Sequence, residues 1–172
     1  LLHMFKDKSE VDCERLISAA LSLGDNGSES DIYRSRDRKA ARTFSSYASK
    51  HHTLKQALNE FLESNPEAVK HNEKFTLDLE ELASLTSLNA TGAEHLDLGD
   101  AIEKGEIIYV IGSMDSARTI KAQTMFLAYL MQYCLNRSLS NASPITIAID
   151  EMRKYLSSTF LNSLAAARDK AT

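Results

Sequence analysis

The sequence predicts an α/β protein with a large helical part, in which an all-α region over residues 1–90 is joined to an α/β region over residues 91–172. Two observations lead to this division. Apolar residues recur at helical spacing up to about residue 88, with no strand-like run among them. From Gly105 onward the pattern changes to strand, helix, strand and helix in turn.

The composition is that of a protein with a buried core. The chain has 172 residues, of which 43% are hydrophobic and 26% charged, enough for one domain or two small ones. Lys and Arg number 20 against 24 Asp and Glu, a net charge of -4, so any binding to nucleic acid must be local. Cys13 and Cys134 form no CxxC pair, which indicates neither a disulfide framework nor a zinc site and suits the reducing cytoplasm. With no apolar run that spans a bilayer and no signal-peptide pattern, we expect no direct membrane insertion.

The first half is expected to contain several helices. Apolar residues at spacings of three and four predict helices around residues 16–23 and 54–62. Acidic residues that suit a helix N-terminus open a third over residues 78–88. Gly, Asn, Asp and Ser cluster in residues 22–31, which predicts a break or loop between the first helices.

The second half is expected to alternate strands and helices. The run "GEIIYVIGS", residues 105–113, is apolar and bounded by glycines, which is typical of a strand buried on both faces. Ser116 is placed to cap a long helix that continues to about Arg137. After a polar loop, "ITIAIDE", residues 145–151, repeats the strand pattern, and residues 158–170 return to helix.

This order predicts that the ends of the two strands lie together. Parallel strands joined by a right-handed crossover bring their carboxyl ends, Ser113 and Asp150, to one edge of the sheet. That edge is where open α/β sheets bind ligands.

Asp150 and Glu151 follow the second strand directly, which is the pattern of a Walker B element. In that chemistry Asp150 orients the waters of a phosphate-bound Mg²⁺, and Glu151, facing the other way, polarises an attacking water. Mg²⁺ keeps most of its own waters, so one carboxylate is adequate. Taken alone, the pair equally suits a strand end that caps the next turn. Arg168, on the following helix, is a candidate phosphate contact, although most such arginines are simply solvated.

The segments "LDLGDAIEKGEIIYVIGSMDSARTIKAQTMFLAYLMQYCLNR" and "ITIAIDEMRKYLSSTFLNSLAAARDKAT" together resemble the type IV coupling proteins of bacterial conjugation, the TraD/TraG-type DNA-translocating ATPases. The resemblance covers about residues 90–172. It implies that residues 91–172 are part of a RecA-like parallel-sheet nucleotide-binding domain and that residues 1–90 are the all-α domain inserted into it. It also implies roles for Asp150, which would hold Mg²⁺ through water, for Glu151 as catalytic carboxylate, and for Arg168 as an arginine that reaches a neighbouring subunit's nucleotide. The family's glycine after this arginine is replaced by Ala171.

The function implied by the resemblance is that of a larger protein. Members are homo-hexameric, DNA-dependent ATPases at the cytoplasmic face of the bacterial inner membrane, which use ATP and Mg²⁺ to pump single-stranded DNA from relaxosome proteins to a type IV secretion channel. This sequence contains no G-x-x-x-x-G-K-[ST] motif for the phosphates. We therefore expect it to be a fragment lacking the P-loop, with no cofactor bound and no enzymatic activity on its own.

A basic run supports an alternative function, a non-enzymatic adaptor that binds DNA or a relaxosome protein. Clustered arginines beside an aromatic residue suit single-stranded DNA. They equally suit a solvated helix face that pairs with the acidic segments 25–31 and 60–67. A fragment of another hexameric RecA-like DNA motor is a further alternative. The basic residues of the run are Arg34, Arg36, Arg38, Lys39 and Arg42.

Overall fold

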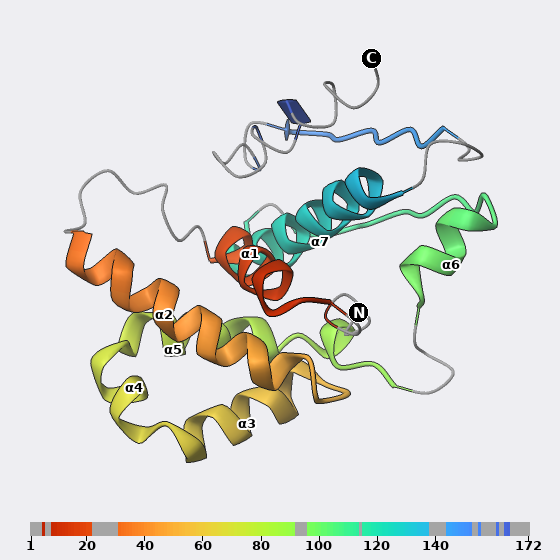
Figure 1. The fold of residues 1–172 in the computed structure, drawn as a ribbon. Helices are drawn as coiled ribbons and strands as arrows, with labels where there is room; N and C mark the ends of the chain where they lie inside the picture. Colours follow the sequence, from red (N-terminus) through yellow and green to blue (C-terminus); the bar gives the residue numbers. More distant parts are fainter. Residues whose placement is uncertain are drawn as a thin grey trace.

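The computed structural model describes most of the chain. The described residues are 5, 8–21, 31–91, 96–113, 115–137, 144–152, 155, 161 and 164–165, without the side chains of residues 31–34. Over these residues the regular secondary structure is helical (Figure 1). Its elements are α1 (Glu10–Ala20), α2 (Asp31–Ala48), α3 (Leu54–Ser64), α4 (Pro66–His71), α5 (Glu73–Ala83), a 3-10 turn (Thr86–Leu88), α6 (Leu98–Glu103) and α7 (Ala117–Asn136).

Side chains that accept hydrogen bonds from the first turn fix where several helices begin. Ser9 caps α1 and Thr53 caps α3, each accepting from the backbone N–H three residues on. Asp97 does the same for α6. Ser116 accepts from the N–H of Thr119, so the predicted start of the long helix is confirmed. The cap at Ser116 is local in sequence, which is why the pattern could reveal it.

The helices pack around a large hydrophobic core. α1 lies against α2 and α7, α2 against α3, α3 against α5, and α5 against α7. Phe61 is fully buried and meets Phe44 and Phe75 edge to face, with ring centroids 5.6 and 6.4 Å apart. α7 adds Met125 to the same cluster. The core therefore joins helices that precede residue 90 to α7.

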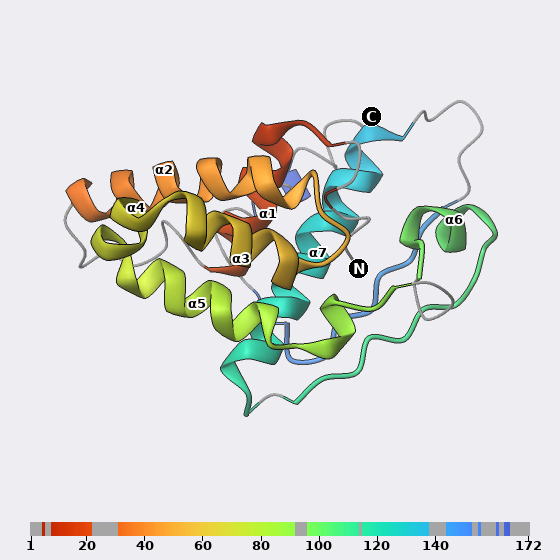
Figure 2. The same cartoon turned by 90° about the horizontal axis from the view of Figure 1, so that it is seen from below.

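The predicted α/β fold with a RecA-like parallel sheet is wrong for the part of the chain that the structure describes. Residues 106–113 and 144–149 are extended, but no hydrogen bonds link them as strands. Both segments lie along α7, run in the same direction and oppose the direction of α7 (Figures 1 and 2). An extended segment, a helix and another extended segment thus follow one another, but neither extended segment is a strand in the described structure.

Packing against α7 explains the difference. Ile108 and Ile147 are half-buried and pack on apolar residues of α7, so one face of each segment is covered without a neighbouring strand. Alternating apolar residues predict an extended chain with one buried face. They do not specify which backbone, if any, pairs with it.

The remaining expectations about elements have mixed outcomes. α3 lies where helical spacing placed a helix, and α1 overlaps the helix predicted around 16–23 but begins six residues earlier. The helix expected over 78–88 is α5, which also begins earlier and is followed by the 3-10 turn. The break expected over 22–31 and the last helix, over 158–170, lie mostly outside the described residues.

None of the described helices is both long and apolar enough to cross a bilayer.

Candidate functional site

The two extended segments and α7 enclose a groove of about 550 Å³. Its floor comes from α7, through Gln123, Phe126, Leu127 and Leu130. Its walls come from residues 105–112 and 144–150, so the chain lines the groove with segments that are far apart in sequence. The groove is therefore a product of the tertiary fold.

Gly112 sets how closely one wall approaches the floor. A Cβ at this position would lie 2.5 Å from both Gln123 Nε2 and Thr119 Cγ2 of α7. Carbon atoms do not approach other heavy atoms so closely, so any larger residue must displace the helix side chains or the segment. The glycine that was read as a strand boundary in fact permits close packing of extended backbone on a helix.

The other wall, residues 144–150, packs against α7 through alternate side chains. Ile145, Ile147 and Ile149 are half-buried, whereas the intervening Thr146 and Ala148 are exposed. Ile147 and Ile149 pack against a cluster of Leu127, Met131 and Tyr155. Because successive side chains of an extended segment point to opposite faces, the apolar face lies toward α7. The segment ends at Asp150.

Asp150 and Glu151 lie at the exposed end of this wall. Asp150 is among the residues that line the groove, and its Oδ1 accepts a hydrogen bond of 2.8 Å from the Glu151 N–H. Glu151 has a φ of 50°, in the left-handed region that residues other than glycine seldom occupy. The expectation that the two acids face apart as neighbours in one strand does not apply, because the chain turns between them.

Tyr155 closes the groove beside these acids. Its hydroxyl donates a hydrogen bond of 2.9 Å to Gln123 Oε1 on α7, and its backbone N–H bonds the carbonyl of Met152. Burial, together with the negative charge of Asp150, raises the pKa of the Tyr155 phenol. The phenol therefore stays protonated at neutral pH and can keep donating to Gln123.

The acids fit a water-mediated contact to Mg²⁺ but not a complete metal site. Among the residues described, no three His, Cys, Asp or Glu side chains gather to hold a metal ion. Mg²⁺ that is bound to phosphates takes only one or two protein carboxylates, and the exposed Asp150 suits that role. The phosphates themselves would need groups that the phosphate-binding motif, absent from this sequence, normally supplies.

The predicted basic residues lie on α2, which does not line the groove. Arg36, Arg38 and Lys39 are exposed. Arg42 is exposed as well, and its Nε donates a 2.9 Å hydrogen bond to Glu14 Oε2 of α1. Glu14 belongs to neither of the acidic segments, 25–31 and 60–67, that the sequence offered as partners. The structure thus places the acids and the basic run in separate regions.

Two predicted residues cannot be placed. Arg168 and the side chain of Arg34 lie outside the described part of the chain.

The chain matches no family model, no curated protein and no solved structure. The functional assignment therefore rests on the residues themselves and on their arrangement.

Sequence reasoning missed the groups that hold α7 in position. Lys121 Nζ lies 2.6 Å from Asp78 Oδ1 and 2.7 Å from Glu81 Oε2, both on α5. Burial of Lys121 lowers its pKa, but the hydrogen bonds to the two carboxylates outweigh burial and raise it. About forty residues separate these partners in sequence, so no local pattern indicates the pairing.

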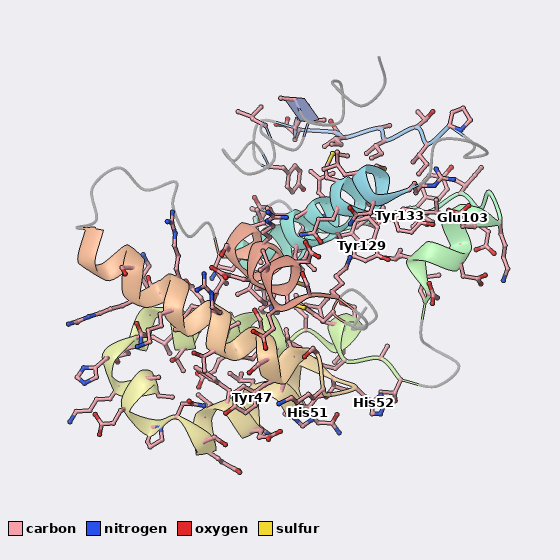
Figure 3. The ribbon with its side chains drawn as sticks, viewed as in Figure 1. Tyr47, His51, His52, Glu103, Tyr129 and Tyr133 are labelled. Atoms are coloured by element: carbon pink, nitrogen blue, oxygen red, sulfur yellow. The ribbon has the colours of Figure 1, made fainter. Side chains whose placement is uncertain are left out.

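A second polar cluster ties α6 to α7. The Tyr133 hydroxyl donates to Glu103, and Arg137 Nε lies 3.1 Å from the same carboxylate (Figure 3). Burial and the bond to Glu103 raise the pKa of Tyr133 to about 12, and the Tyr133 and Arg137 hydrogen bonds lower that of Glu103. Because α6 leads directly into the extended residues 106–113, this cluster fixes where that wall of the groove begins.

The sequence contains two adjacent histidines, His51 and His52. His51 Nε2 contacts Glu60 Oε2 of α3, while the exposed His52 follows it in the connection between α2 and α3 (Figure 3).

Proposed function

We propose that the chain is part of a conjugative coupling protein that uses ATP hydrolysis to recruit single-stranded DNA and move it to a type IV secretion channel. The observation that supports the proposal is the Asp150–Glu151 pair at the exposed end of residues 144–149, beside a second extended segment that runs in the same direction. Asp150 lines the groove, where a carboxylate can orient the water shell of a phosphate-bound Mg²⁺.

In this proposal each acid has a separate role. Asp150 would orient the water shell of Mg²⁺ bound to ATP, and Glu151 would accept a proton from the attacking water. Arg168 would reach the nucleotide of a neighbouring subunit. The working protein would be a hexamer at the cytoplasmic face of the bacterial inner membrane, in contact with relaxosome proteins and the channel.

The test is to replace Glu151 with Gln in the longer protein that carries this chain. We expect DNA-stimulated ATP hydrolysis to fall at least about 100-fold, because positioned proton transfer contributes that much or more. ATP binding should be retained, since the amide keeps the shape of the carboxylate.

Glu63→Gln is the matched control for this experiment. Glu63 is an exposed acid on α3 that does not line the groove, and its replacement should leave ATP hydrolysis unchanged. Full DNA-stimulated hydrolysis by the Glu151→Gln protein would refute the proposed role of the pair.

Exposed basic side chains favour a second candidate, a non-enzymatic adaptor that binds single-stranded DNA through α2. Arg36, Arg38 and Lys39 are all exposed on this helix. Each contact with a phosphate makes binding more sensitive to salt, because it releases a counterion.

Titration of this chain with single-stranded DNA at two salt concentrations tests the candidate. Binding that weakens with salt, and that weakens further when Arg36 and Arg38 are changed to Gln, would support it. Arg118→Gln is the control, because Arg118 is an exposed arginine on α7. Absence of binding at both salt concentrations would exclude the adaptor without bearing on Glu151.

A further inference from the structure

We propose that residues 106–113 form a self-association surface, through which two copies of this chain pair edge to edge as antiparallel strands about a two-fold axis at Tyr109. The inference goes beyond the proposed function, because it requires neither nucleotide nor DNA.

The outer face of this segment is strongly apolar and exposed. Ile107 is 81% exposed, Tyr109 82% and Ile111 93%. They occupy alternate positions of one extended segment, so they share a face. Val110, at an intervening position of the same segment, is 45% exposed, whereas other exposed apolar residues, such as Val11 and Leu77, lie on separate helices. A contiguous apolar patch of this kind marks an interaction surface more often than a scattered residue does.

The backbone of the segment is also unpaired. Within the described part of the chain, the N–H and C=O groups of residues 107–112 make no hydrogen bond. The nearest bonds are those of Glu106 N–H to the Ala101 carbonyl and of Ser116 N–H to the Ser113 carbonyl. Extended backbone with free donors and acceptors is a template to which another strand can add.

The sequence of the segment makes a second copy the best occupant. No charged residue occurs from Ile107 to Ser113, so pairing the segment with itself brings no like charges together. In antiparallel register about Tyr109, the two tyrosines lie opposite each other and each Ile107 lies opposite the partner's Ile111. Aromatic and β-branched pairs of this kind are among the most favourable across two strands.

The other extended segment, residues 144–149, is also uncharged and without backbone hydrogen bonds among the described residues, but it lacks an exposed apolar face. Its isoleucines, Ile145, Ile147 and Ile149, face α7, and its outer face presents Thr146 and Ala148. A partner strand would therefore gain little apolar contact there.

Sedimentation velocity at a series of concentrations tests the association. A pair of short strands covers less than the roughly 1,200 Å² of a standard stable interface, so we expect a dissociation constant on the order of micromolar. Ile111→Lys should raise this constant at least about tenfold, because it replaces both Ile107–Ile111 contacts with a charged group that loses solvent on pairing. Ile111 is so exposed that the change should not alter the helical circular dichroism.

Leu77→Lys is the control, since it introduces the same charge at an exposed leucine on α5 and should leave association unchanged. A chain that stays monomeric at all concentrations would overturn the proposal. So would an unchanged dissociation constant in Ile111→Lys, or an equal loss in Leu77→Lys.

Cysteine cross-linking tests the register, in a Cys134→Ser background that leaves only the buried Cys13. Tyr109→Cys should form disulfide-linked dimers, because the two-fold axis places position 109 opposite itself. Ile107→Cys alone should not, since its two copies would be about 14 Å apart along the strands, too far for a disulfide. A mixture of Ile107→Cys and Ile111→Cys proteins should cross-link. Equal yields from all single variants would show random collision and overturn the register.

Discussion

Gly112 brings the backbone of the extended segment 106–113 close to side chains of α7. A methyl group there would lie 2.5 Å from atoms of Thr119 and Gln123. We expect Gly112→Ala to lower the free energy of unfolding by about 1 to 3 kcal/mol, as overpacking does. Thermal or urea unfolding followed by circular dichroism measures the change.

The matched control removes the atoms that Ala would meet. Adding Thr119→Ser and Gln123→Ala to Gly112→Ala should recover part of the lost stability, compared with the same two changes in the presence of Gly112. If Gly112→Ala alone has no effect, the segment does not rest on α7 as described.

Cys13 should make stability depend on pH in the alkaline range. Its thiol is buried and donates a 3.7 Å hydrogen bond to the Phe5 carbonyl, and burial raises its pKa to about 11. A thiol in the unfolded chain loses its proton at lower pH, so folding favours the protonated form. The contribution of Cys13 to stability is therefore complete below about pH 9 and is lost as the pH rises toward 11.

Denaturant unfolding between pH 8 and about 11 measures this dependence. Cys13→Ala should lose less stability over that range than the unaltered chain, whatever its stability at pH 8. The half-buried Cys134 provides the control, because its replacement by Ala should change the dependence less. Parallel curves for the Cys13→Ala and unaltered chains would contradict the prediction.

At the scale of elements, Lys121 joins α7 to α5 by contacting Asp78 and Glu81. We expect Lys121→Met to lower the free energy of unfolding by about 1 kcal/mol, since partly buried ion pairs contribute more than fully exposed ones. The effect should shrink in high salt.

A double-mutant cycle separates the two carboxylates. Asp78 is less exposed than Glu81, with 22% against 54% of its side chain accessible, so coupling of Lys121 to Asp78 should exceed coupling to Glu81. Equal couplings would contradict the predicted order of the two carboxylates. The absence of both couplings would show that the Lys121 ion pairs do not hold α5 and α7 together.

How far the sequence predicts each element depends on whether its determinants are local. α7 was predicted nearly to its ends, because the cap at Ser116 and the apolar seam lie within the helix itself. The extended character of residues 106–113 and 144–149 was also predicted. The prediction that they pair in a sheet was wrong, because strand pairing depends on backbone that is distant in sequence. At the candidate site, the acids at the end of residues 144–149 were anticipated. The contact of Tyr155 with Gln123, 32 residues away, had no local signal.

At the scale of the whole molecule, protection from hydrogen exchange should divide the chain. Amides of α7 are hydrogen-bonded and adjoin the core, so they should exchange only when large parts of the structure open. Amides of residues 107–112 make no hydrogen bond within the described chain and should exchange nearly as fast as in an unstructured peptide. Exchange followed by mass spectrometry at low concentration measures both.

The same experiment at high concentration has a different expected result. If copies pair through this segment, part of its amides should become protected while those of α7 change little. Strong protection of residues 107–112 at low concentration would instead mean that the segment already has a partner within the chain.

α7 is the element on which both extended segments rest, and it is tied to the helices that precede residue 90 through Lys121 and Met125. A force applied to either segment would consequently be transmitted through the 20-residue α7 to the helices that precede residue 90. A shift of either segment along α7 would change the shape of the groove between them.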